Sequence, residues 1–135
     1  MHIDNVKFLI LSKFAYTKFS EKPAQKEIIT QLAGEGPCVI VGRCADYILR
    51  DIADCITVFV HASDEQRAER AVTVYGQREE SPAERLHEKD SRRKAYYELY
   101  TGTEWGKADG YHLCLDSGKI GIDKCVDMIA DLYQS

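Results

Sequence analysis

Residues 36–42 read Gly-Pro-Cys-Val-Ile-Val-Gly, a short apolar run enclosed by two glycines. The apolar residues are consecutive and do not alternate with polar ones, which is typical of a strand buried on both faces of a parallel sheet. The same pattern occurs in Cys-Ile-Thr-Val-Phe-Val at 55–60 and in Tyr-His-Leu-Cys-Leu at 111–115. The sequence therefore predicts three buried strands.

Helical patterns lie before, between and after these strands. Ser63 with Gln66, and Ser81 with Glu84, have the spacing of a capping box, in which two side chains satisfy the free N–H groups at the start of a helix. Elsewhere, apolar residues repeat at helical spacing. We expect helices over residues 23–33, 44–51, 63–74, 81–100 and 121–133.

The order of these elements predicts the fold class. Buried strands that alternate with helices indicate an α/β domain with three layers, in which a mainly parallel sheet is flanked by helices. The length of 135 residues suits a single domain over 1–135. Ligands of such sheets bind outside the carboxyl ends of the strands. We therefore expect chemistry directly after Val41, Val60 and Leu115.

Composition excludes several classes of protein. The chain has 18 Lys and Arg against 22 Asp and Glu, and this net charge of -4 disfavours binding of a nucleic acid polymer through bulk charge. No apolar run approaches the roughly 20 residues of a membrane span. The five cysteines form no Cys-x-x-Cys pair, which favours reduced thiols and a cytoplasmic location. The four histidines are scattered, so we expect no metal site built from His and Cys.

The first candidate for chemistry is Arg43 with Asp46, directly after the first predicted strand. An arginine offers a planar fork of N–H groups to a phosphate, and an aspartate accepts hydrogen bonds from a base or a sugar hydroxyl. The alternative is an Arg–Asp surface pair at the start of a helix.

The second candidate is a series of cations between positions 67 and 94. Several of these residues are three or four positions apart on the predicted helix 81–100 and so share one face. In an acidic protein such a cluster fits a small polyanion such as a nucleotide. The alternative is a solvated helix face paired with Glu84, Glu88 and Asp90. The cations are Arg67, Arg70, Arg78, Arg85, Lys89, Arg92, Arg93 and Lys94.

The third candidate is the aromatic stretch 96–106, which reads Tyr-Tyr-Glu-Leu-Tyr-Thr-Gly-Thr-Glu-Trp-Gly. Its rings could stack on a base or cap the hydrophobic core.

The segment 5–19 is rich in apolar residues, among them Phe8-Leu9-Ile10-Leu11. We interpret it as a helix that is apolar nearly all round and therefore buried or packed against another surface. This predicts a helical segment over 1–20, followed by an α/β core over 21–135.

Residues 36–49, Gly-Pro-Cys-Val-Ile-Val-Gly-Arg-Cys-Ala-Asp-Tyr-Ile-Leu, resemble the central motif of the cytidylate kinase-like family, one of the P-loop nucleoside monophosphate kinases. Further matches lie at 58–62, 90–97, 100–102 and 105–115. The matches run in order from about residue 20 to residue 133, so the resemblance covers most of the chain.

This resemblance implies a transferase that uses ATP to phosphorylate a nucleoside monophosphate such as CMP. Arg43 and Asp46 match positions that bind the acceptor nucleotide. Arg92 and Arg93 match the catalytic lid arginines that neutralise the transferring phosphate.

The resemblance also implies a donor side. Arg67 and Arg70 are expected near the lid or the donor, as phosphate or nucleotide contacts. ATP and Mg²⁺ are the cofactors of the family, although the residues of this chain show no site for either.

One family feature is missing from the sequence. No Gly-x-x-x-x-Gly-Lys-Ser/Thr motif occurs, so the phosphate-binding loop has no counterpart, and we interpret the chain as a P-loop kinase fold truncated at the N-terminus. In the family the strand before this loop lies between the strands that match 38–41 and 56–60. Its loss predicts that these two strands pair directly, that the chain forms a homodimer, or that it is only marginally stable. Residues 5–19 could instead fill the gap or contact a partner.

Two functions remain open from sequence. The first is the nucleoside monophosphate kinase of the family, with these 135 residues inactive alone because the phosphate loop is absent. The second is a non-catalytic nucleotide-binding or interaction module derived from the kinase fold, since a fold does not prove an activity.

Overall fold

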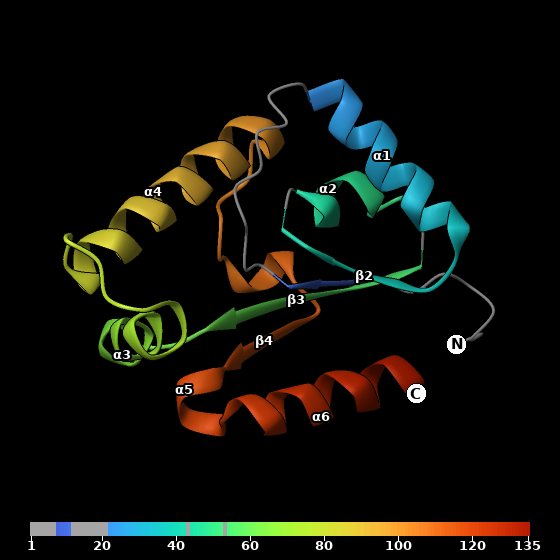
Figure 1. Cartoon of the computed structure of the whole chain (residues 1–135). Coiled ribbons are helices and arrows are strands. Elements are labelled where there is room, and N and C mark those ends of the chain that lie inside the picture. The colour runs from blue at the N-terminus through green and yellow to red at the C-terminus, as the bar shows by residue number, and fades with distance from the viewer. Residues whose placement is uncertain (1–7, 12–21, 43, 53) are drawn as a thin grey trace.

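The computed structural model describes residues 8–11, 22–42, 44–52 and 54–135. Among them, four parallel strands form one sheet in the order β2-β1-β3-β4, which Figure 1 shows at the centre of the molecule. The strands are β1 (Phe8–Leu11), β2 (Cys38–Val41), β3 (Cys55–His61) and β4 (Leu113–Asp116). The three predicted strands are confirmed, with the last one beginning at Leu113 and not at Tyr111, but burial on both faces is not general, since Val39 of β2 is 60% exposed.

The helices match the predicted ranges closely. They are α1 (Lys22–Glu35), α2 (Ala45–Leu49), α3 (Asp64–Tyr75), α4 (Pro82–Thr101), the short α5 (Ser117–Ile120) and α6 (Ile122–Gln134), with a 3-10 turn at Ala108–Gly110. None of these described helices is both long and apolar enough to cross a membrane.

The helices cover both faces of the sheet, as Figure 1 shows. On one face, α1 and α2 pack through Ile29, Ala33, Ala45, Ile48 and Leu49. On the other face, Cys125 and Ile129 of α6 pack against Ile56, Val58 and Leu115. The predicted mixed α/β architecture, a parallel sheet flanked by helices, is confirmed.

Local capping explains why α3 and α4 begin where they do. The Ser63 and Ser81 hydroxyls each accept a hydrogen bond from the backbone N–H three residues later, at 3.2 Å in both cases. Both capping boxes are complete. Gly102 ends α4 in the left-handed conformation, with φ 70°, and its N–H donates to the carbonyl of Glu98. The two helices are therefore set by their own sequence.

The expectation for the N-terminal segment is corrected. Residues 8–11 form strand β1 and not a helix, while the rest of 5–19 lies outside the described residues. A run of four apolar residues does not distinguish a buried strand from a buried helix. Here the strand satisfies backbone groups on both edges by pairing with β2 and β3. The predicted direct pairing of 38–41 with 56–60 is wrong, and the filling of the gap is confirmed for residues 8–11.

Candidate functional site

A pocket of about 240 Å³ opens at the carboxyl ends of β3 and β4, where a parallel sheet is expected to bind ligands. Val60, Ala62 and Ile122 give it apolar walls. Arg67 and Arg70 of α3 line the same pocket, as the sequence predicted for this edge of the sheet. Apolar surface and two cations therefore lie together.

Close contacts between α3 and the chain after β4 shape this pocket. The Gln66 side chain donates to the carbonyl of Gly118 at 3.1 Å. A Cβ at position 118 would lie 1.7 Å from Gln66 Oε1, so any other residue there would displace the end of the Gln66 side chain. The Asp116 carboxylate accepts the N–H groups of Gly118 and Lys119 at 3.0 and 3.2 Å and starts α5. The pocket wall is thus built by a tight turn against α3.

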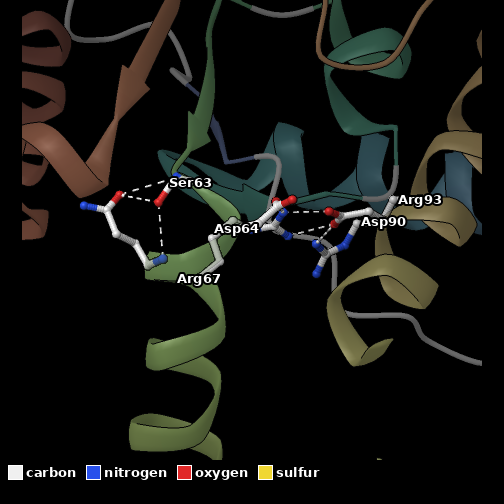
Figure 2. A network of polar contacts seen from close by, with 6 residues as sticks. Ser63, Asp64, Arg67, Asp90 and Arg93 are labelled. Atoms are coloured by element: carbon white, nitrogen blue, oxygen red, sulfur yellow. Dashed lines mark hydrogen bonds and ion pairs between the residues drawn. The ribbon is translucent and has the colours of Figure 1, made fainter. Parts of the chain in front are cut away.

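Arg67 of α3 and Arg93 of α4 converge on one carboxylate, Asp90 of α4, as Figure 2 shows. Arg67 Nη1 donates to Asp90 Oδ2 at 2.6 Å, and its Nη2 donates to Oδ1 at 2.9 Å. Arg93 Nη1 donates to Oδ1 at 3.0 Å. The hydrogen bonds that Arg67 donates to Asp90 raise the pKa of Arg67 and outweigh the effect of burial. The network joins a pocket residue to a predicted lid arginine.

The two predicted lid arginines separate in the structure. Arg93 is mostly buried within the network, whereas the Arg92 side chain is 64% exposed and pairs with Glu88 one turn earlier. Consecutive residues of an α-helix point about 100° apart, and here the two side chains turn to different partners. Arg92 thus matches the alternative interpretation, in which the cations of this helix are solvated and paired with acidic residues.

The shared cationic face predicted for α4 is not continuous. Arg85 is buried, at 4% exposure, and Nη1 donates to the carbonyl of Gly76 at 3.0 Å, which ties α4 to the end of α3. Lys89 lies over the ring of Tyr75, 5.9 Å from its centre. These cations therefore serve helix packing, because their side chains turn to neighbouring elements and not to the pocket.

Asp46 lies in the core at the start of α2, and its predicted partner Arg43 is outside the described residues. The side chain is 4% exposed, so a surface Arg–Asp pair does not describe it. The Asp46 carboxylate accepts a hydrogen bond from the Tyr97 hydroxyl at 2.8 Å. Burial raises the pKa of Asp46, and the Tyr97 hydrogen bond partly opposes this. This carboxylate joins α2 to α4.

The aromatic stretch packs against the sheet and α2. Tyr97 is buried, and the ring of Trp105 meets the edge of Phe59 with ring centres 5.6 Å apart. Tyr100 stacks on Tyr96 and meets Tyr47 edge to face. Capping of the core therefore accounts for Tyr97 and Trp105.

Sequence reasoning assigned no functional role to Asp90 or Gln66. Asp90 was visible only as a partner on its own helix, because its i,i+3 spacing to Arg93 is local. Its contact with Arg67 joins residues 23 positions apart and depends on the packing of α3 on α4. The capping-box pattern identified Gln66 as the partner of Ser63 at the start of a helix, but it could not show that Gln66 lines a pocket.

Comparisons with known proteins place this geometry in context. Among curated proteins, none matches the sequence. The crystal structure of an uncharacterized protein from Eubacterium ventriosum ATCC 27560 is similar, with a TM-score of 0.79 and 22% identity over 96% of this chain and 98% of that chain. At that identity the likeness shows a shared fold. The cytidylate kinase-like family model matches residues 6–119, so the chain belongs to the cytidylate kinase-like family.

Proposed function

We propose that this chain binds a nucleotide at the carboxyl edge of its sheet and derives from a phosphotransferase that moves a phosphate from ATP to a CMP-like monophosphate. Membership of the cytidylate kinase-like family supports a nucleotide kinase-like function in general. The observation that carries the proposal is the pocket after β3 and β4, which places Arg67 and Arg70 beside apolar walls.

The chemistry of the pocket suits a nucleotide. The planar guanidinium of an arginine offers paired N–H groups to phosphate oxygens. Val60 and Ile122 offer apolar surface to a base or sugar. Arg93, held through Asp90, adds charge for the transferring phosphate. Catalysis of phosphoryl transfer consists mainly of positioning and electrostatic stabilisation, which such groups supply.

The acceptor side of the proposal rests on Arg43 and Asp46. Arg43 would bind the acceptor phosphate. Asp46 is turned towards Tyr97, so its part is to hold the start of α2, three residues after Arg43 in the chain. The buried carboxylate therefore affects acceptor binding indirectly, by fixing the position of α2.

A magnesium ion has no cage of protein ligands in the part of the chain that the structure describes. No group of three or more His, Cys, Asp or Glu side chains gathers there. The described residues therefore offer no complete protein cage, and Mg²⁺ would be held mainly by the phosphates of the nucleotide, so we assign no step to it. Since the sequence also lacks the phosphate-loop motif, we propose that these 135 residues alone bind nucleotide but do not transfer phosphate.

The test is a calorimetric titration of CMP and then ATP-Mg into the 135-residue chain, with ADP release followed in a coupled assay. We expect CMP binding that is lost in Arg43→Ala, ATP binding that is lost in Arg67→Ala, and no turnover. Arg78→Ala removes an exposed arginine outside the pocket and is the matched control. ATP-dependent turnover would overturn the inactivity, and absence of binding by either nucleotide would overturn the proposed site.

The alternative function is a non-catalytic interaction module. A second, apolar groove of about 360 Å³ between β2 and α6 favours it, since Val39 and Val126 on its sides are more than half exposed. If neither nucleotide binds, this reading takes precedence. Homodimer formation stays a prediction, to be checked by sedimentation equilibrium.

A further inference from the structure

Asp90 receives three N–H groups from two arginines on different helices. Arg67 approaches with both Nη atoms, and Arg93 shares Oδ1 with one of them. The side chains of Asp90 and Arg67 are each 26% exposed, and that of Arg93 is 17% exposed. The contacts are therefore shielded from solvent more than an ordinary surface ion pair, and water competes less for them.

A forked pair constrains an arginine more than a single contact does. Two parallel N–H···O bonds set the plane of the guanidinium as well as its position. Arg67 also lines the pocket at the end of β3, so Asp90 holds a residue of the candidate site. An arginine ordered in advance loses less conformational entropy when a phosphate binds.

We propose that Asp90 is a positioning residue for phosphate binding, which holds Arg67 at the pocket and couples it to Arg93 so that both arginines act on one ligand. This role rests on the proposed nucleotide site. The charge of Asp90 has the same sign as that of a phosphate. Asp90 nevertheless strengthens phosphate binding, because it fixes the position of the Arg67 guanidinium.

The sign of this effect separates positioning from simple electrostatics. Asp90→Asn removes one negative charge near the pocket, so Coulomb attraction alone predicts tighter binding of an anion. Positioning predicts weaker binding, because an amide cannot accept the forked pair from Arg67. Asp64 supplies a matched control: it lies 3.8 Å from Arg67 Nη1, but its side chain is 93% exposed. Asp64→Asn removes the same charge without removing the fork.

The experiment titrates ATP-Mg, and separately inorganic tripolyphosphate, into the full chain while NMR follows the arginine Nη–Hη signals, which report the fork to Asp90. Wild type should show a protected Arg67 signal and bind both probes. Asp90→Asn should lose that signal and about tenfold in affinity, equal to about 1.4 kcal/mol. Asp64→Asn should bind within about twofold of wild type, and Asp90→Glu should recover part of the loss.

A second variant guards against a fold defect in Asp90→Asn. Arg67→Lys keeps the charge and loses the fork, so positioning predicts weaker binding and charge alone predicts no change. Wild-type binding combined with equal or tighter binding by Asp90→Asn or Arg67→Lys would overturn the role of Asp90 and leave the proposed function standing. A wild-type chain that binds neither probe would overturn both.

Discussion

Asp46 and Asp90 both join α4 to another helix, yet the surroundings of the two carboxylates differ. Asp46, on α2, is buried and accepts a hydrogen bond from the neutral hydroxyl of Tyr97. Asp90, on α4, is partly exposed and contacts two guanidinium groups. Burial raises the pKa of Asp46, whereas Asp90 raises the pKa of its partner Arg67. Burial thus disfavours the charged form of Asp46, whereas the α3–α4 network pairs Asp90 with two cations.

The difference shows which contacts suit structure and which suit ligand binding. A buried carboxylate held by a tyrosine offers little to an incoming phosphate, which carries the same charge. Around Asp90 two arginines meet two aspartates, since Asp64 also lies 3.8 Å from Arg67 Nη1, and Arg67 lines a pocket as well. The α3–α4 region therefore borders the proposed nucleotide site, whereas the Asp46 region is a helix anchor.

The largest expected effect on stability is that of Asp90→Ala. Removing the carboxylate leaves Arg67 and Arg93 partly buried without their shared acceptor, which should cost about 2 kcal/mol of unfolding free energy. Urea denaturation measures this loss. Asp64→Ala is the control and should cost under about 0.5 kcal/mol, since its side chain is exposed. Equal losses in the two variants would contradict the anchoring role of Asp90.

Tyr97→Phe tests the other carboxylate. The variant keeps the ring in the core and removes the hydroxyl that donates to Asp46, so a buried carboxylate loses a hydrogen bond. We expect a loss of about 1.5 kcal/mol in unfolding free energy. Repeating the change in an Asp46→Ala background, which removes the acceptor, forms a double-mutant cycle. A coupling energy near zero would show that the hydroxyl and the carboxylate do not act together.

The pH dependence of stability follows from the raised pKa of Asp46. Because the folded chain holds this proton more tightly than the unfolded chain, the group's contribution to stability is complete below the unfolded pKa and is lost as pH rises through the folded pKa. Asp46→Asn lacks this loss. Its stability relative to wild type should therefore increase with pH above the unfolded pKa of roughly 4 and level off once the pH passes the folded pKa.

Urea unfolding of the wild type and Asp46→Asn over that pH range provides the measurement. The difference should be smaller than the effect of Tyr97→Phe, because the amide oxygen still accepts from the Tyr97 hydroxyl. Parallel stability curves for the two proteins would contradict a raised pKa at this position.

The sequence predicted those parts of the fold that local signals determine. The capping boxes at Ser63 and Ser81 placed the starts of α3 and α4, because both partners of each box lie within one helical turn. β1 was not predicted, since its four apolar residues carry no period of their own. Its strand form depends on β2 and β3, which offer backbone partners on both edges.

For the candidate site, the sequence predicted the sheet edge and the residue types that line the pocket there, while their function stays a proposal. Arg67 and Arg70 lie at the carboxyl edge where the strand pattern located the chemistry. The partners of Asp46 and Arg67 could not be predicted, because Tyr97 and Asp90 are 51 and 23 residues away in the sequence. The different directions of Arg92 and Arg93 could have been predicted, since consecutive side chains of a helix point about 100° apart.

The smallest expected effect belongs to the exposed pair Glu88 and Arg92. Both side chains are more than half exposed, so solvent screens their attraction, and Glu88→Gln should change unfolding free energy by only about 0.3 kcal/mol. Urea denaturation at low and high salt provides the measurement, with Asp90→Ala as the contrasting variant. A salt-independent loss above about 1 kcal/mol would show that Arg92 is held as firmly as Arg93. The contrast along α4 between the solvated pair of Glu88 with Arg92 and the network around Asp90 would then not hold.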